Sequence, residues 1–532
     1  MPSPTLALLL VFVVQAGPAP SDTLTRLPLL NGPEEDRIRV AQLRGDAPFG
    51  GFIIRSASSL LAPLPPAPSG LVLRWLAPEL RLLRNSALPH SLNEGPLWAG
   101  RGLSGRLTGG LHARYGDLIL ILAPQGLGWE NRPFQTASYP DLAPGRKRHA
   151  LASAFHYPPG SMDLPQRLGE SRQLFLDPGQ SSLTFRRERV ALGFATENLW
   201  WGPGIRNGLL MSAQAPGFPH LFVETGRPMG TPLGDLRARW TLGRLSESAY
   251  FDFDASNDHR SLSGLVLELT PWFDAGLSLG LARTVIAPSG SVPLDAALDA
   301  FRNVGRPAQE PGDTLLAPGP DQLFSVFGRW VFPEAGFEVY GEWGRAEQPA
   351  SLREFLQIPQ HSRGYTVGVQ HVRPLGGENR LLRLQSEVTS LEPSQSFRVR
   401  EVGEWYASRR VPQGYTHRGR VLGAAIGPSA SSQWAAVDWM APDWSVGVFL
   451  GRIRWEAEAH QSYLPEFRRA DISLLPGVRG RAPLGRFRID ASYTYGLRLN
   501  YLFQAWPITP TRYRGVDIVN HTLAVTLSTG HP

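Results

Sequence analysis

Residue types that support catalysis are present in this chain, but their spacing forms no catalytic constellation. Gly276-Leu-Ser-Leu-Gly280 matches the G-x-S-x-G pattern of serine hydrolases. That pattern needs a sharp strand-to-helix turn at the serine, whereas this one continues in regular alternation through Leu281. Ser278 is therefore interpreted as a small residue on the polar face of a strand. The chain has no cysteine, which excludes thiolate nucleophiles, disulfides and cysteine-ligated metals.

Histidines and carboxylates also lack a metal-binding or acid–base pattern. The 12 histidines are scattered, and no H-E-x-x-H, Walker or EF-hand sequence occurs. His361 and His371 are interpreted as loop and strand residues rather than as ligands. Glu338 and Glu342 share a strand face and could form a carboxylate pair, but an acid opposite an arginine is the ordinary way to fill a polar interior. We expect no catalytic residue, no metal and no cofactor, and thus no enzyme.

One short stretch favours a binding role. Glu197-Asn-Leu-Trp-Trp-Gly-Pro-Gly-Ile-Arg-Asn-Gly208 places two adjacent tryptophans before a Gly-Pro-Gly break. Neighbouring strand residues point to opposite faces, so Trp200 and Trp201 are expected to face opposite ways, one toward lipid or the membrane interface and one toward the interior, with the break at the rim. Aromatic rings there anchor a protein in the membrane or stack on sugars. The candidate carbohydrate-binding residues are Trp200, Trp201, Arg206 and Asn207. The alternative is that they only fold the strand end and its turn.

The elements that would position these residues are strands. From Leu71 onward, apolar and polar residues alternate with period two, as in 276–281, 250–254 and 487–495. Several runs approach the length with which a tilted strand crosses the hydrocarbon. Roughly sixteen to twenty such runs, some with aromatic residues near their ends, indicate a large closed barrel. The fold class is therefore all-β, a large antiparallel transmembrane β-barrel. A secreted all-β protein is the alternative.

The N-terminal part of the chain differs. Leu6–Val14 is an apolar run followed by a small-residue cleavage pattern, so residues 1–16 are interpreted as a secretory signal peptide, although no basic residue precedes the run. Residues 17–70 are expected to form a periplasmic segment with one helix, since Pro33 suits a first helical position and Gly45 a stop. Residues 71–532 are expected to form the barrel. No later run is long enough for a membrane helix.

The charge is basic and comes almost entirely from arginine. The formal net charge is +7, and Lys147 is the only lysine. This composition reflects either a GC-rich genome or a surface that selects bidentate contacts to carboxylates. Charge alone does not separate nucleic acid, anionic lipid and acidic polysaccharide as partners.

The stretch Glu197–Leu221 resembles the signature of the Wzi family of capsule assembly proteins, in which Trp-Trp-Gly-Pro-Gly precedes a Leu-Leu/Ile pair and a proline-containing segment. Residues 94–110, 329–345 and 412–434 are similar to members from bacterial groups other than the enterobacteria. Together these stretches extend the resemblance over most of residues 70–530. The resemblance implies an outer-membrane barrel of about 18 strands with a small helical element at its periplasmic end. The characterised type is a lectin that holds capsular polysaccharide at the cell surface, without catalytic activity.

Two features depart from the family. The N-terminal region offers one helix instead of a helical bundle. The last strand has a good lipid face in Leu523, Val525 and Leu527, but no terminal aromatic residue follows it.

The leading hypothesis is a non-enzymatic protein of the bacterial outer membrane that binds exported capsular or other surface polysaccharide, of acidic character, and helps to attach or assemble it at the cell surface. The alternative is a channel or export pore for anionic solutes or polysaccharide. A barrel hydrolase is a third reading, with no nucleophile–base set to support it. Expected partners are the polysaccharide and outer-membrane lipid, with no nucleic acid, and the protein is expected to be a monomer. Occlusion of the lumen separates the first two hypotheses, because a lectin can be closed and a channel cannot.

Overall fold

The computed structural model describes residues 24–50, 52–64, 70–137, 149–156, 161–288, 294–302, 319–347, 351–376, 380–394, 404–458, 469–508 and 513–529. The signal peptide predicted at residues 1–16 lies outside these ranges. Within them, no helix is both long enough and apolar enough to cross a membrane.

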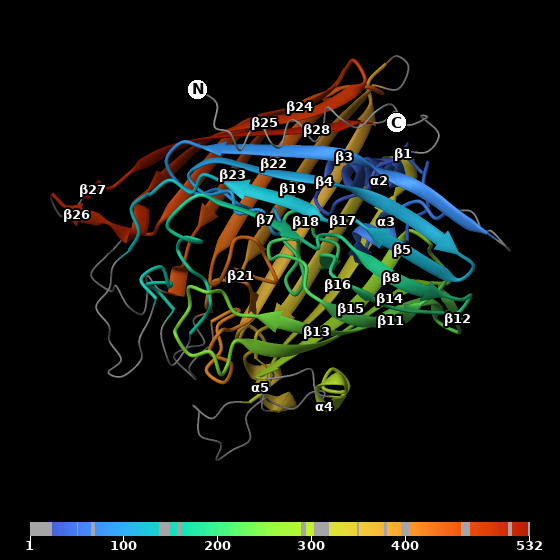
Figure 1. The fold of residues 1–532 in the computed structure, drawn as a ribbon, viewed down its shortest axis with the longest axis horizontal. Coiled ribbons are helices and arrows are strands. Elements are labelled where there is room, and N and C mark those ends of the chain that lie inside the picture. Colours follow the sequence, from blue (N-terminus) through green and yellow to red (C-terminus); the bar gives the residue numbers. More distant parts are fainter. Residues whose placement is uncertain are drawn as a thin grey trace.

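The chain forms a closed antiparallel β-barrel of 18 strands (Figure 1). The ring begins with β3 (Leu71–Asn85) and β4 (Gly102–Tyr115), and it closes where β28 (Ile518–Thr529) pairs with β3. Two of the 18 wall positions are each shared by two short strands. These are β5 (Leu118–Leu122) with β6 (Gln125–Trp129), and β7 (Gln173–Asp177) with β8 (Ser182–Arg186). The other wall strands are β9 (Val190–Ala195), β11 (His220–Thr225), β13 (Gly234–Ser246), β14 (His259–Pro271), β15 (Leu277–Pro288), β16 (Asp321–Phe332), β17 (Phe337–Arg345), β18 (Arg363–Pro374), β19 (Leu381–Ser390), β22 (Ser431–Met440), β23 (Ser445–Arg454), β24 (Ile472–Leu484) and β25 (Phe487–Leu499).

The wall is apolar outside and polar inside. On β18, Val367 and Val369 are exposed, whereas the flanking Thr366 and Gln370 are buried in the lumen. The same alternation runs through the neighbouring strands, and it is the reverse of the pattern in a soluble protein. An apolar outer band of this kind is what a barrel presents to lipid.

Alternation in the sequence predicted strands at 276–281 and 487–495, and both are confirmed by β15 and β25. The prediction of a strand at 250–254 is wrong, because these residues lie in the connection between β13 and β14. There the carboxylate of Asp252 accepts the backbone N–H of Asp254 at 2.7 Å, and that of Asp254 accepts Ser256 N–H at 3.0 Å. Such side-chain turns compete with strand pairing.

The two ends of the barrel differ in the length of their connections. At one end the turns are short, as at 116–117, 272–276 and 485–486. At the other end the connections are long, as at 130–172 and 391–430. In outer-membrane barrels the short turns face the periplasm and the long loops face outward, so the second end is extracellular.

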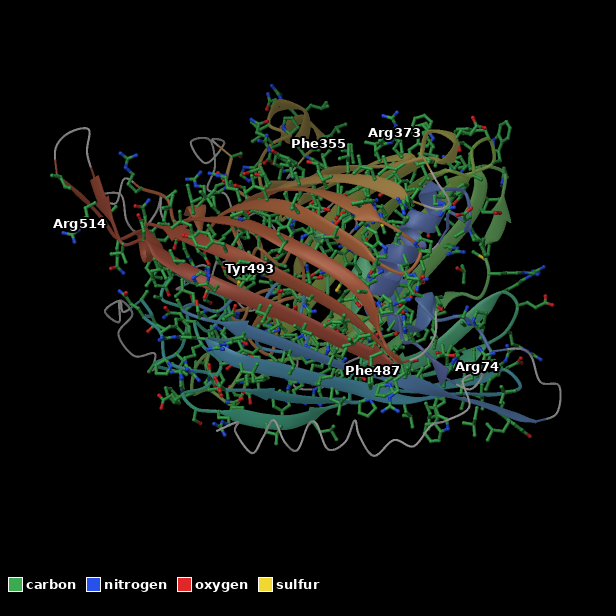
Figure 2. The ribbon with its side chains drawn as sticks, turned by 90° about the horizontal axis from the view of Figure 1, so that it is seen from above. Arg74, Phe355, Arg373, Phe487, Tyr493 and Arg514 are labelled. Atoms are coloured by element: carbon green, nitrogen blue, oxygen red, sulfur yellow. The ribbon has the colours of Figure 1, made fainter. Side chains whose placement is uncertain are left out.

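The N-terminal segment enters the lumen from the periplasmic end. Its helix α2 (Pro33–Leu43) confirms the predicted helix, with Pro33 in the first turn and Gly45 at φ 76° beyond the end. Figure 2 shows this helix, in blue, enclosed by the wall strands. Val40 and Leu43 pack against inward-facing residues of β16 and β18. The segment continues into β2 (Ile54–Ser56) and the short helix α3 (Ala57–Leu60).

Extracellular connections fold into the lumen from the opposite end. The connection after β9 carries β10 (Leu199–Trp201), which pairs with β2 of the N-terminal segment. The 391–430 connection carries β20 (Thr416–His417) and β21 (Arg420–Val421). These pieces share one buried apolar cluster that includes Trp201, Leu209, Trp405 and Tyr406. The described part of the chain therefore fills much of the lumen. The remaining elements are β1 (Leu24–Thr25), β12 (Met229–Thr231), α4 (Leu294–Ala297), η2 (Pro333–Ala335), α5 (Leu352–Gln357), η4 (Tyr501–Phe503), β26 (Ala505–Pro507) and β27 (Tyr513–Gly515).

Candidate binding site inside the barrel

Trp200 and Trp201 lie inside the barrel, on β10, and both are 0% exposed. They do point to opposite sides of their strand. Trp200 packs in a cluster with Leu30 and Ala213 and beneath the Arg55 guanidinium, 4.9 Å from the ring centroid. Trp201 belongs to the large apolar cluster of the lumen. The prediction that one ring faces lipid at the rim is wrong, because β10 is not part of the wall. A role in sugar binding stays a prediction for these two rings, which are covered in this structure.

The Gly-Pro-Gly turn after β10 is held in place by carboxylates of the wall. Glu387 accepts backbone N–H groups of Ile205 at 2.7 Å and Asn207 at 2.9 Å, and the N–H of Arg206 at 3.1 Å. From the N-terminal segment inside the lumen, Arg55 donates to the carbonyl oxygens of Gly202 and Gly204. Three successive N–H groups on one carboxylate fix the backbone, and so fix where the Arg206 side chain begins.

The other acids and histidines considered in the sequence have structural partners. Glu338 accepts from Arg39 at 2.7 Å and from Arg329 at 2.6 Å, which confirms the expectation of an acid opposite an arginine. Glu342 instead accepts the backbone N–H of Leu209 at 3.0 Å.

Ser278 lies within β15 on its buried face, and no helix follows it, so the serine-hydrolase geometry is absent there. His361 is a loop residue and His371 a residue of β18, as interpreted from the sequence.

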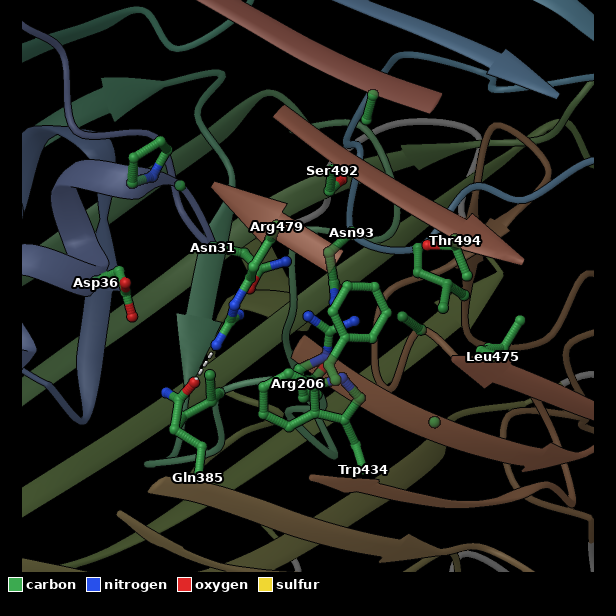
Figure 3. A pocket seen from close by; sticks show the side chains of 18 of the residues that line it. Asn31, Asp36, Asn93, Arg206, Gln385, Trp434, Leu475, Arg479, Ser492 and Thr494 are labelled. Atoms are coloured by element: carbon green, nitrogen blue, oxygen red, sulfur yellow. Dashed lines mark hydrogen bonds between the residues drawn. The ribbon is translucent and has the colours of Figure 1, made fainter. Parts of the chain in front are cut away.

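A cavity of about 320 Å³ lies between α2, the 202–208 turn and the wall (Figure 3). The wall contributes β3, β19, β22–β25 and β28. Hydroxyl and amide groups line part of it, and Figure 3 shows Gln385, Ser492 and Thr494 among them. The charged residues that line it are seven arginines and five carboxylates: Arg39, Arg81, Arg206, Arg383, Arg452, Arg479, Arg481, Glu35, Asp36, Glu94, Asp438 and Asp490.

Five of these seven arginines are ion-paired. Arg81 pairs with Glu94 at 2.5 Å, Arg479 with Asp438 at 2.6 Å, and Arg481 with Asp490. Arg383 pairs with both Asp36 and Asp438, and Arg39 pairs with Glu338. Arg206 and Arg452 have no carboxylate of the described residues within ion-pair distance, and Arg452 donates instead to the Gln433 side chain at 2.8 Å.

The Arg206 guanidinium lies over the ring of Trp434, 4.9 Å from the centroid. Arg479 also lies over this ring, at 5.2 Å. A guanidinium stacked on an aromatic face keeps its in-plane N–H donors available for bidentate contact with a carboxylate or phosphate. Arg206 is therefore held in a preformed orientation at the cavity, without a carboxylate partner among the described residues.

Two neighbouring groups add to the polarity of this site. Asn207, which is 3% exposed, donates to Thr389 and Ser432, while its Oδ1 has no hydrogen-bond partner among the described residues. His90 also lines the cavity, and burial together with the positive charge of Arg206 lowers its pKa to about 4. His90 is therefore a neutral hydrogen-bonding group at pH 7. The predicted pair Arg206 and Asn207 thus reaches one cavity, while the two tryptophans do not.

Sequence reasoning missed Trp434 and Glu387. The sequence did carry a signal for Trp434. In the strand 431–440, Trp434 lies on the same face as Asp438, whereas Val437 and Trp439 lie on the opposite face. An aromatic residue on the polar face of a barrel strand marks a lumen site. The role of Glu387 has no comparable signal in the sequence, because its partners lie about 180 residues away in the chain.

A second cluster lies among the extracellular connections. His156 faces Glu404 with Nδ1 and Glu456 with Nε2, each at 3.3 Å. Burial lowers the pKa of His156, but the two carboxylates outweigh it and raise the pKa to about 10. The ring is therefore an imidazolium at neutral pH. A ring that is protonated on both nitrogens has no lone pair for a metal ion.

The closed barrel, the apolar outer band and the polar lumen define an outer-membrane β-barrel protein. No protein-family model and no curated protein sequence matches the chain. Among solved structures, it is similar to Wzi of Escherichia coli, described as an outer membrane protein involved in group 1 capsule assembly and a carbohydrate-binding β-barrel. The TM-score is 0.55 at 12% identity, over 86% of this chain and 85% of that chain.

Two further structures align at lower TM-scores. They are OccAB2 of Acinetobacter baumannii, at 0.39 with 8% identity over 85% of this chain and 97% of that one, and OccK5 (OpdH) of Pseudomonas aeruginosa, at 0.37 with 9% identity over 86% and 98%. The similarity to the Wzi structure shows that the chain has a Wzi-like fold.

Proposed function

We propose that the protein is a non-enzymatic outer-membrane lectin that binds an exported acidic polysaccharide and helps to attach or assemble it at the cell surface. The observation that carries this proposal is Arg206, which stacks on Trp434 and has no carboxylate partner among the described residues, in a cavity where five other arginines are ion-paired. Carboxylate groups of acidic sugars would occupy the in-plane donors of this guanidinium. The carbohydrate binding described for the similar Wzi structure supports the same reading.

The remaining lining suits a sugar. Ser432, Ser492 and Thr494 offer hydroxyl groups, and Gln385 and Asn207 offer amides. A cavity of about 320 Å³ is at the small end of ligand sites, which span ~300–1,000 Å³. It would therefore hold one or two sugar units of a longer chain rather than an extended oligosaccharide.

A channel is the second candidate, and one observation favours it. A smaller cavity of about 90 Å³ adjoins the first and shares Asn31, Arg81 and Glu94 with it. It extends along the N-terminal segment to Arg26. If movement of the N-terminal segment joined these two cavities to both ends of the lumen, anionic solutes would have a path lined with arginine.

The test is calorimetric titration of the purified, folded protein with acidic and neutral oligosaccharides. Arg206→Gln should weaken binding of the acidic ligand by about 10-fold to 100-fold, the value of one charge-assisted hydrogen-bonded contact, and should leave weak binding of a neutral ligand unchanged. Arg227→Gln is the matched control, since Arg227 is 61% exposed at a periplasmic turn. Equal affinities for wild type and Arg206→Gln would contradict the assignment of the site.

A further inference from the structure

Two asparagine side chains that line the cavity carry an oxygen atom with no hydrogen-bond partner among the described residues. They are Asn93, which is 8% exposed, and Asn207, which is 3% exposed. The amide nitrogen of each is engaged. Asn93 Nδ2 donates to the Arg206 carbonyl at 2.8 Å, and Asn207 Nδ2 donates to the hydroxyl groups of Thr389 at 3.2 Å and Ser432 at 3.3 Å. These bonds fix how each amide is turned and leave Oδ1 as the acceptor without a partner.

The other buried asparagines of the described residues lack this feature. None of them lines the cavity, and the Oδ1 of each accepts a hydrogen bond within the protein. The four pairs are Asn85 with Thr522, Asn131 with Arg167, Asn198 with Gln180, and Asn520 with the backbone N–H of Leu88. Buried polar groups are nearly always hydrogen-bonded. Two unsatisfied acceptors on one cavity therefore indicate where the hydrogen-bond donors of a ligand would lie.

Asn93, Arg206 and Asn207 form one continuous unit. Asn93 is bonded to the backbone of Arg206, and Asn207 is the next residue of the turn that Glu387 fixes. Figure 3 shows Asn93 and Arg206 together in the cavity. The backbone of Asn93 has a φ of 58°, in the left-handed region that asparagine adopts more readily than most residues. The unit thus holds guanidinium donors and two amide acceptors at fixed positions relative to one another.

A ligand that satisfies this unit carries both an acid and free hydroxyl groups. The in-plane N–H groups of Arg206 match a planar carboxylate, whereas an amide oxygen only accepts and needs an O–H or N–H donor. A uronic acid offers a carboxylate and several hydroxyl groups on one sugar ring. Phe449 and Leu475 line the same cavity and would contact the apolar face of that ring. A sugar whose hydroxyl groups are capped would leave the two amide oxygens unpaired.

We propose that Asn93 and Asn207 bind free ring hydroxyl groups of the same sugar unit whose carboxylate Arg206 binds. The site then selects uronic acids with unsubstituted hydroxyl groups. This inference rests on the proposed binding of an acidic polysaccharide and adds a specificity to it. A site that is built to hydrogen-bond a hydroxyl group rejects an analogue without it, because a buried acceptor is left unpaired. O-alkylated or O-acylated stretches of a polysaccharide would therefore be poor ligands.

The test is calorimetric titration of the folded full-length protein with short oligogalacturonates and oligoglucuronates and with their O-methyl ethers, which keep the carboxylates and lack the hydroxyl donors. Wild type should bind the uncapped form of its preferred oligomer about 100-fold more tightly than the ether, at about 10-fold for each of two hydroxyl groups. Asn93→Gly, which accepts the positive φ, and Asn207→Ala should each reduce this ratio to about 10-fold. The comparison of the two ligand forms on wild type needs no substitution, so it does not depend on the folding of a variant.

The matched control is Asn257→Ala. Asn257 lies in an extracellular connection outside the cavity, and its Oδ1 accepts from Gln413 at 2.9 Å. This variant should keep the wild-type ratio. Equal affinity of wild type for the two ligand forms, or a ratio that neither cavity variant changes, would overturn the inference. If Arg206→Gln still weakened binding in that case, the proposed function would stand, whereas failure of wild type to bind any of the acidic oligomers would overturn both.

Discussion

At the scale of residues, the wall carboxylates have a positioning role. Glu387 and Glu342 accept backbone N–H groups of the turn and of Leu209, so the wall orders an extracellular connection that has turned inward. The conspicuous residues of the sequence, Trp200 and Trp201, build the apolar interior that supports this turn. The functional candidate next to them is Arg206, whose side chain leaves the turn toward the cavity.

Also at this scale, the His156 cluster predicts a pH dependence of stability. The folded-state pKa of about 10 exceeds the ordinary value of about 6.5. The folded state therefore binds more protons than the unfolded state between these values, and stability falls as pH rises through this window. The contribution of the His156 imidazolium to the free energy of unfolding is fully present below pH ~6.5 and is lost above pH ~10.

His156→Gln should remove this dependence, which we expect to be on the order of a few kcal/mol. The measurement is the free energy of unfolding in lipid vesicles at pH 6, 8 and 10. The wild-type protein should lose its advantage over the variant as pH increases. An advantage that stays constant from pH 6 to pH 10 would show that the imidazolium does not hold these connections together.

At the scale of elements, helix α2 is attached to the wall by a buried ion network. Glu338 of β17 accepts from Arg39 of α2 and from Arg329 of β16, and Gln370 donates to it at 2.6 Å. All four side chains are essentially buried. Removal of one charge from such a network leaves the others uncompensated.

Glu338→Gln should therefore destabilise the protein by about 3–5 kcal/mol, since two buried guanidinium groups lose their carboxylate. Glu334→Gln, at an exposed position of the same hairpin, is the control and should be neutral. Denaturant unfolding from vesicles measures both. If the two variants unfolded alike, α2 would not depend on this network for its attachment.

The elements also show what was predictable from the sequence. Period two predicted the wall, and proline, acids and glycine predicted α2, because these signals are local. The strand prediction for residues 250–254 was wrong because alternating phenylalanine and aspartate residues there form side-chain turns instead of a strand. The rim position of Trp200 and Trp201 was wrong because no local signal reports that a connection between wall strands folds inward to pair with β2. The cavity could not be predicted either, since it joins residues from seven wall strands and four separate internal segments.

At the scale of the whole molecule, the structure is a barrel filled from both ends. The N-terminal segment enters from the periplasm and pairs through β2 with β10 of the 196–219 connection, which enters from outside. The 391–430 connection also enters from outside and packs against both in the apolar cluster. A lumen filled in this way supports the proposed binding role over the channel proposal, and both proposals place arginines in the lumen.

Binding of the cell's own acidic surface polysaccharide to the detergent-folded protein should be measured at low and high salt, with bilayer conductance recorded on the same preparation. A closed lectin should bind the polysaccharide more weakly at high salt, because ionic contacts are screened, and should show no steady conductance. Steady conductance without polysaccharide binding would contradict it and identify a pore.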